Sequence, residues 1–262
     1  MNQHIGLLRL GFEELVVAIG IAGYQDNANK LLSINLDTTN VDENRGRLFA
    51  ATHSLISKEL VVLEKDTPRL QEDFRYLIEI INNYDFSVRL NLNVNKLENI
   101  LAFYYLKSKI IQQEILPGSV YQFSWVTEPD QIIQQGLDFL KINECNDFDC
   151  PESEIQQSVL EEAKKKAATQ PETILEYFKN NDIPDETARL LNDDFIHTSF
   201  RGSVMRVEKR DGKIISDRGF LVMVHKPRAW LFPIFLKDNV PYVNIIPGTE
   251  ASFKKEAFAL LD

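Results

Sequence analysis

The pattern of apolar and polar positions in residues 200–262 predicts a strand meander that a helix closes. Four apolar-rich runs follow one another here, and turn-forming residues separate them. Runs of Val, Ile, Leu and aromatic residues bounded by Gly, Pro, Asn and Asp are typical of β-strands. After residues 247–249 the apolar positions return to a helical spacing. The turn-forming residues occupy positions 209–212, 216–219, 226–228 and 237–239.

An earlier part of the chain has the same order of elements. Residues 86–92 alternate apolar and polar side chains, which predicts a strand with one buried face. Three more apolar runs follow, with Pro117 and Gly118 as a turn between the last two. A helical pattern then closes the series. The five predicted elements occupy residues 86–92, 100–106, 109–116, 120–126 and 128–140.

Apolar residues spaced three and four apart predict helices in most of the remaining chain. Pro68 is placed to begin one of them, because proline is well tolerated in the first turn. Ser153 is placed to cap another. Residues 35–44 are predicted as a loop, and residues 60–63 as a short strand or an extended link. The predicted helices cover residues 11–22, 27–32, 45–58, 66–81, 153–168, 171–178 and 184–191.

Because the two halves match in element order, we predict an α+β fold with a quasi-twofold arrangement. Each half consists of helices, a four-strand antiparallel meander and a closing helix, and the halves together form one unit. The corresponding core positions of the closing helices are Ile133, Leu137 and Leu140, and Phe253, Ala257 and Leu260. The predicted boundaries are residues 1–142 for the N-terminal half, 143–152 for an acidic linker and 153–262 for the C-terminal half.

Composition and charge narrow the class of protein. With 44% hydrophobic and 26% charged residues, the 262-residue chain has the composition of a globular protein. Its net charge of −10 argues against nonspecific nucleic-acid binding, because Lys and Arg make most phosphate contacts. No apolar run is long enough for a transmembrane helix, so no membrane insertion is expected. The two cysteines give no disulfide framework, which fits a cytoplasmic location.

No catalytic or metal-binding signature occurs in the sequence. Cys145 and Cys150 lie in an acidic loop, at a spacing that is unusual for zinc. No Gly-rich phosphate loop and no nucleophile elbow is present. We therefore expect a non-enzymatic protein without a cofactor or metal, and an enzyme with a scattered Asp, Glu and His site is the alternative. The histidines, none at a metal-ligand spacing, are His4, His53, His197 and His225.

Positive charge concentrates on the turns and outer strand positions of the last meander. In one interpretation these side chains pair with carboxylates such as Glu208, Asp211 and Asp217. In the other they form an edge that meets an acidic partner. Trp125 and Trp230 are expected in the core, and an exposed one would be an interface anchor. The cluster is Arg201, Arg206, Lys209, Arg210, Arg218, Lys226 and Arg228, and the candidate partner-binding residues are Arg206, Arg210, Arg218, Lys226 and Arg228.

The order of elements resembles that of the EspG-type chaperones of type VII secretion. The matching segments are GFEELVVAIG in the leading helix and RGSVMRVEKRDG, RGFLVMVHKPRAWLFPI and YVNIIPGTEASFKKEAFALL in the last half. The resemblance rests on order and pattern over nearly the whole chain. It implies a cytoplasmic, non-enzymatic protein that binds the helical-hairpin tip of a secretion substrate and keeps it soluble.

The resulting hypothesis is a chaperone-like protein whose partner presents a helical hairpin or an amphipathic helix. The chain is rich in Asn, Ile and Lys, whereas familiar members of the family are rich in Ala and Gly, so a different partner on the same fold stays open. A homodimer is also left open. A structural homo-oligomer that pairs through exposed sheet edges is the third hypothesis.

Overall fold

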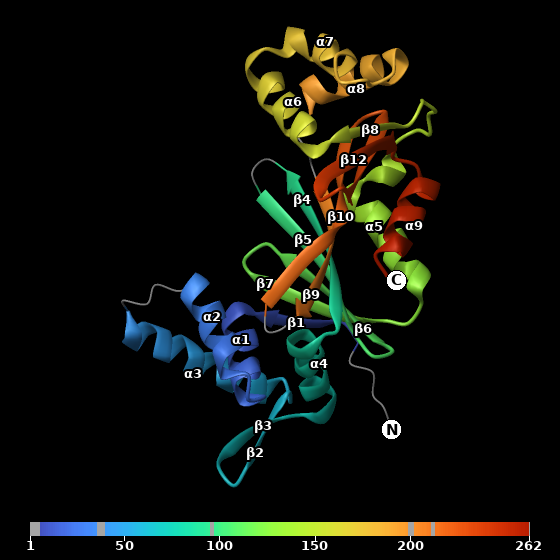
Figure 1. Cartoon of the computed structure of the whole chain (residues 1–262). Coiled ribbons are helices and arrows are strands. Elements are labelled where there is room, and N and C mark those ends of the chain that lie inside the picture. The colour runs from blue at the N-terminus through green and yellow to red at the C-terminus, as the bar shows by residue number, and fades with distance from the viewer. Residues whose placement is uncertain (1–5, 36–39, 95–96, 199–201, 211–212, 262) are drawn as a thin grey trace. The chain divides into compact units, whose positions relative to one another are not determined.

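The computed structural model describes residues 6–35, 40–94, 97–198, 202–210 and 213–261 (Figure 1). The chain divides into two compact units. Two neighbouring strands, β4 (Phe86–Val94) and β5 (Leu97–Leu106), contribute residues to both of them. The first unit comprises Met1–Ser87 and Ala102–Thr127, and the second comprises Val88–Leu101 and Glu128–Asp262.

An antiparallel meander forms the sheet of the first unit. β5, β6 (Lys109–Leu116) and β7 (Val120–Val126) follow one another in the sheet. A short strand, β1 (Leu8–Gly11), pairs antiparallel with β7 and places Leu10 opposite Tyr121. The strand order in this unit is therefore β1-β7-β6-β5.

Amphipathic helices bury the apolar side chains of the first unit. Phe12 and Leu15 share one core cluster with Phe74, Leu77 and Phe123. A separate two-stranded hairpin precedes the last of these helices. The elements are α1 (Phe12–Ile21), α2 (Gln25–Asn35), α3 (Val41–Ser57), β2 (Val61–Glu64), β3 (Thr67–Leu70) and α4 (Glu72–Asn83).

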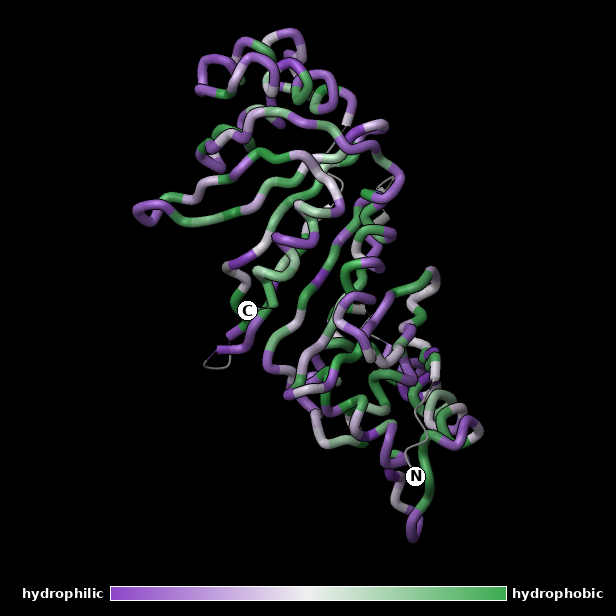
Figure 2. The backbone as a smooth tube through the Cα atoms, turned by 90° about the vertical axis from the view of Figure 1, so that its right-hand side faces the viewer, coloured by the Kyte–Doolittle hydropathy of each residue, from purple (hydrophilic) through white to green (hydrophobic). Residues whose placement is uncertain are grey.

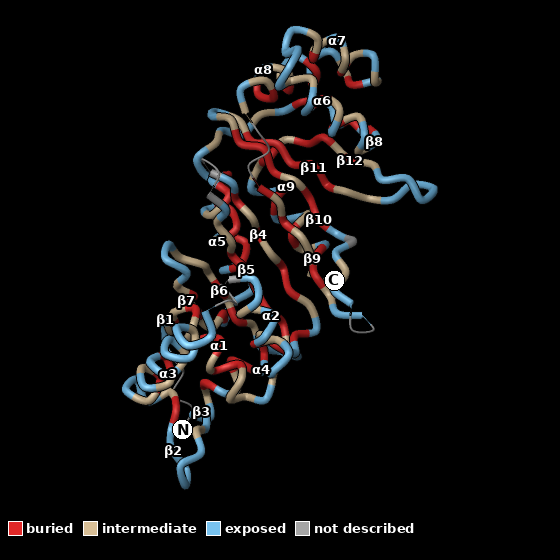
Figure 3. The backbone as a smooth tube through the Cα atoms, turned by 90° about the vertical axis from the view of Figure 1, so that its left-hand side faces the viewer, coloured by how far each residue is buried: buried red, intermediate tan, exposed pale blue. Residues whose placement is uncertain are grey.

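A second meander forms the sheet of the second unit, in the order β4-β9-β10-β11-β12-β8. Buried positions run along its strands in Figure 3. Figure 2 shows that hydrophobic stretches follow the long strands, whereas the turns are largely hydrophilic. The strands are β8 (Ser153–Gln156), β9 (Gly202–Arg210), β10 (Lys213–His225), β11 (Arg228–Lys237) and β12 (Val240–Pro247).

Two groups of helices pack in the second unit. α5 (Pro129–Leu140) and α9 (Glu250–Ala259) touch closely, since a Cβ atom at Gly136 would lie 2.7 Å from Cζ of Phe253. The other helices bury Leu160, Phe178 and Leu191 in a cluster that includes Trp230. They are α6 (Gln157–Thr169), α7 (Ile174–Lys179) and α8 (Asp185–His197), with 3-10 turns η1 (Ile142–Glu144) and η2 (Pro171–Thr173).

The fold is α+β with a large antiparallel sheet, as predicted, and two strands that the prediction missed add to the likeness of the halves. β1 pairs with the last strand of the first meander and leads directly into α1. β8 pairs with the last strand of the second meander and leads directly into α6. Each is only four residues long, which is too short for a periodicity to reveal.

Three predicted boundaries are wrong. Residues 66–70 do not begin a helix, because Pro68 lies in β3 and the side chain of Gln71 caps α4 by accepting a hydrogen bond from the Phe74 amide. Ser153 does not cap a helix, because it lies in β8 and is buried. The predicted loop at 35–44 is too long, since α3 already begins at Val41 after Asn40 caps it.

The predicted break at residues 216–219 is also wrong. β10 continues through this segment, and a register shift against β9 between Ile215 and Arg218 accommodates the polar residues. Such a β-bulge keeps the strand continuous while it changes its direction and twist. The sequence signal at this point therefore marks a bulge and not a turn.

Candidate partner-binding site

The basic hairpin, which we define as β9 and β10, carries most of the predicted partner-binding cluster. Alternating Val, Met and Ile with polar residues makes these segments strands with one apolar face. Exposed Arg210, Lys213 and Arg218 lie toward the end of the hairpin. His4, Arg201 and Asp211 lie outside the described residues.

A carboxylate joins two of the predicted arginines. Glu208 accepts a hydrogen bond from Nε of Arg206 at 2.6 Å and forms an ion pair with Nη2 of Arg210 at 2.7 Å. Arg206 also donates to the backbone oxygen of Leu260 at 2.7 Å, so it holds the end of α9 against β9. The hydrogen bond from Arg210, together with Arg206, lowers the pKa of the Glu208 carboxyl despite partial burial.

Arg218 lies directly opposite Arg206 in the β9–β10 register. Like charges opposite one another repel unless one of them is compensated. Arg206 is compensated by Glu208 and is largely buried, whereas the side chain of Arg218 is exposed. Arg218 is therefore the member of this pair that a partner can reach.

Lys226 and Arg228 lie in the connection between β10 and β11 and make different contacts. Lys226 is exposed and pairs with Glu144 at 2.5 Å. The hydrogen bond from Lys226 lowers the pKa of the Glu144 carboxyl and raises the pKa of the lysine. Because this pair is exposed, an acidic partner could replace Glu144 at small cost.

Arg228 belongs to a buried network on the inner side of the sheet. Its Nε and Nη2 donate to the two oxygens of Asp194, at 2.7 and 2.9 Å. Nε1 of Trp230 donates to the same carboxylate at 2.7 Å. Asp194 and Trp230 are fully buried, as expected for a core tryptophan, and the Asp194 hydrogen bond raises the pKa of the Arg228 guanidinium. Arg228 thus ties β11 to α8.

Large apolar side chains are exposed on the helices of the first unit. Ile34 of α2 is 78% exposed, and Val41 and Phe49 of α3 are 68% and 67% exposed. The rings of Phe49 and His53 pack edge to face, with their centroids 4.5 Å apart. Large exposed apolar side chains are a feature of protein-binding surfaces where they form a contiguous patch. The sequence does not reveal this surface, because a helical pattern does not show which face lacks a neighbour.

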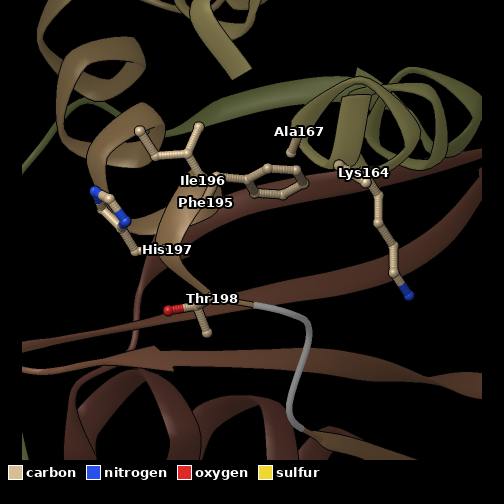
Figure 4. Close-up of a pocket in the computed structure, with 7 residues that line it drawn as sticks. Lys164, Ala167, Phe195, Ile196, His197 and Thr198 are labelled. Atoms are coloured by element: carbon tan, nitrogen blue, oxygen red, sulfur yellow. The ribbon is translucent and has the colours of Figure 1, made fainter. Parts of the chain in front are cut away.

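A small cavity of about 270 Å³ lies between α6 and the end of α8 (Figure 4). Phe195 and Ala167 give it an apolar wall, and Lys164 and His197 lie at its rim. The hydroxyl of Thr198 is buried there and has no hydrogen-bond partner among the described residues. A second cavity, of about 570 Å³, lies in the first unit beside β3, where Arg69 pairs with Glu64.

No catalytic arrangement emerges from the part of the chain that the structure describes. Groups of His, Cys, Asp or Glu that could hold a metal ion do not occur among the described residues. Cys145 and Cys150 are free thiols, and burial raises the pKa of both. Among the described helices, none is long and apolar enough to cross a membrane.

The fold is that of a type VII secretion chaperone. The structure of EspG5 from Mycobacterium tuberculosis, a type VII secretion system chaperone in complex with a PE25–PPE41 dimer, superposes with a TM-score of 0.71. The match covers 98% of this chain and 96% of EspG5 at 11% sequence identity, so the resemblance predicted from the sequence is confirmed for the fold.

The chain belongs to the YfjC family, whose model, described as "Uncharacterised protein YfjC", matches residues 8–205. YfjC of Bacillus subtilis (strain 168) is 22% identical over 195 residues, which is 72% of this chain and 76% of that protein.

Proposed function

We propose that the protein is a non-enzymatic, chaperone-like binding protein of the cytoplasm that holds an exposed helical segment of a protein partner. The observation that carries this proposal is the fold, which matches a secretion chaperone over nearly the full length of both chains. At 11% identity the match gives the architecture, and the partner of EspG5 cannot be transferred to this chain.

Exposed side chains on the described surface support a protein partner. Ile34, Val41 and Phe49 offer apolar area that a helix could cover. Of the five candidate partner-binding residues, Arg210, Arg218 and Lys226 are exposed and can meet acidic groups of the partner. Arg206 and Arg228 are held in ion pairs with Glu208 and Asp194 and position the strands that carry the others.

Chemical cross-linking in the native host tests this function. The tagged protein is cross-linked in living cells, purified and analysed by mass spectrometry. We expect one helical protein to be recovered repeatedly and at stoichiometric yield. Repeated recovery of the chain alone, or of a changing set of abundant proteins, would contradict a dedicated partner.

A variant pair identifies the surface that the partner uses. Phe49→Ser combined with Ile34→Ser removes exposed apolar area, and we expect it to reduce recovery of the partner at least fivefold. Val240→Ser is the matched control, because Val240 is an apolar residue that is 40% exposed in the other unit. Equal recovery with all variants would show that this apolar surface is not the contact.

A further inference from the structure

β10 and β11 pair along only part of their lengths. Their register runs from His225 opposite Arg228 to Gly219 opposite Ile234, where it ends. Beyond this point β10 continues to Lys213 beside β9, and β11 continues to Lys237 beside β12. The β9–β10 and β11–β12 hairpins diverge from here in Figure 3.

The divergence leaves two sheet edges open. For residues 213–218 of β10 the described residues provide strand pairing on the β9 side alone, and for residues 235–237 of β11 on the β12 side alone. No other backbone hydrogen bond within the described part of the chain reaches these two stretches. An open edge presents N–H and C=O groups that can pair with a further strand.

The sequence explains why the strands separate at this point. Gly219 is the last paired residue of β10, and a Cβ atom there would lie 2.4 Å from the backbone oxygen of Val204. This close approach and the bulge before it bend β10 toward β9. In β11, Pro233 lies opposite Phe220 of β10, and the register of β11 with β12 is interrupted at residues 232 and 233.

The open edge of β10 is also exposed and partly apolar. Ile214 is 66% exposed on β10, and Leu236 is 69% exposed on β11. Residues 213–218 span at most about 20 Å at roughly 3.3 Å per residue, which is the length of a typical strand. An apolar, unpaired edge of this length is a template for β-augmentation by an extended peptide.

The positive charge along this edge favours an acidic strand as its ligand. Lys213 and Arg218 are exposed on the edge segment, and Lys209 and Arg210 lie opposite it on β9. Asp217 is the one acidic residue of the segment, and Glu208, opposite Ile215 on β9, is paired with two arginines, so positive charges outnumber negative ones along this edge. A second copy of the same edge would bring two segments of net positive charge together, which repels, whereas an acidic strand is attracted.

We propose that residues 213–218 of β10 bind an extended acidic segment of a protein partner as an added strand. This inference rests on the proposed function for its partner and adds to it a second kind of contact. The partner presents a helical segment to one surface and an acidic, extended segment with alternating apolar residues to this edge.

Fluorescence anisotropy with a synthetic peptide tests the edge directly. The probe is a short fluorescein-labelled peptide of alternating Glu and Val, and two matched probes replace Glu by Lys or methylate every backbone nitrogen. We expect saturable binding of the acidic probe that weakens with added salt, and at least tenfold weaker binding of both matched probes. No binding of the acidic probe, or equal binding of the methylated one, would overturn strand addition.

Charge reversal in the protein locates the site. We expect Lys213→Glu with Arg218→Glu to weaken binding of the acidic probe at least tenfold without a change in melting temperature. Lys165→Glu with Lys255→Glu, on exposed positions of α6 and α9, is the control and should leave binding unchanged. Equal losses in both double variants would mean general electrostatic attraction and would overturn the assignment.

The same variants separate this inference from the proposed function. In one outcome, the acidic peptide fails to bind the wild type, but cross-linking still recovers the helical partner with Lys213→Glu/Arg218→Glu. The proposed function then stands, and the edge site is overturned. If the peptide binds but no partner is recovered, the edge site stands alone. A dimer in light scattering that the double variant abolishes would assign the edge to a second copy and overturn the acidic occupant.

Discussion

Some contacts between elements depend on single residues, and neither secondary-structure propensity nor hydrophobic periodicity predicts them. Asp194 is fully buried and accepts three hydrogen bonds, two from Arg228 and one from Trp230. A buried carboxylate is tolerated only with such compensation, because transfer from water disfavours its charged form. The network therefore specifies how α8 meets β11 as much as it stabilises the contact.

Removing the partner of this carboxylate should be costly. We expect Arg228→Ala to lower the free energy of unfolding by roughly 3 kcal/mol, because Asp194 is left buried with an uncompensated charge. Arg210→Ala removes an exposed partner of Glu208 and should cost less than about 1 kcal/mol. Urea denaturation of both variants measures the difference, and equal losses would contradict the special position of Asp194.

Gly219 should tolerate no larger side chain. A Cβ atom there would meet the backbone oxygen of Val204 at 2.4 Å, so we expect Gly219→Ala to destabilise by about 1–3 kcal/mol. Gly46 lies within α3, where a Cβ atom meets nothing within 4 Å, and Gly46→Ala should stabilise by up to about 1 kcal/mol. Thermal unfolding of the two variants should shift in opposite directions.

At the scale of elements, a buried carboxylate also ties helices together in the first unit. Glu14 of α1 accepts a hydrogen bond from the Gly11 amide at the start of its own helix. It also accepts hydrogen bonds from Ser54 in α3 and from Lys58, which directly follows that helix. Burial alone would raise the pKa of Glu14, but the bonds from Lys58, Ser54 and Gly11 outweigh it and lower the pKa below its ordinary value of 4.5.

This carboxylate should contribute to stability in a defined pH range. Since the pKa of folded Glu14 is lowered, its contribution is complete above pH 4.5 and is lost as the pH falls from there through the folded pKa. We expect Glu14→Gln to be less stable than the wild type at pH 7 and to lose less stability between pH 5 and the acid range. Urea denaturation of both proteins across this pH range measures the difference, and parallel profiles would contradict a stabilising role for the Glu14 carboxylate.

The closing helices differ in how deeply their predicted core residues are buried. Leu137 of α5 is 2% exposed, so Leu137→Ala should destabilise by about 2–5 kcal/mol. Phe258 of α9 is only half-buried with Lys254 over its ring, so Phe258→Ala should cost clearly less. Phe253, at 1% exposed, is the buried aromatic residue of that helix. Chemical denaturation of the three alanine variants tests this order.

At the scale of the whole chain, charge restricts the kind of partner. The net charge of −10 opposes phosphate binding, because 39 acidic residues outnumber 29 lysine and arginine residues, although the basic hairpin gathers several of the latter. We expect no shift of a short DNA duplex by micromolar protein at physiological salt, because counterion release would be too small. A stable, salt-sensitive complex in a gel-shift assay would contradict a purely protein-binding role.

The sequence by itself determined the class of fold, because each long element carries its own periodicity. Alternation in residues 86–92 and helical spacing in residues 128–140 predict β4 and α5, and the same reasoning gives the second meander and α9. The order of these elements was sufficient for the resemblance to secretion chaperones that the fold confirms.

Only the tertiary structure decided which side chains are available for binding. Arg206 and Arg218 look equivalent in the sequence, but one lies in a nearly buried ion pair and the other is exposed at an open edge. Neither the strands β1 and β8 nor the exposed Phe49 follows from local pattern, because each depends on what lies beside it in space. Periodicity records which face of an element is apolar, whereas pairing and exposure depend on neighbours that are distant in the chain.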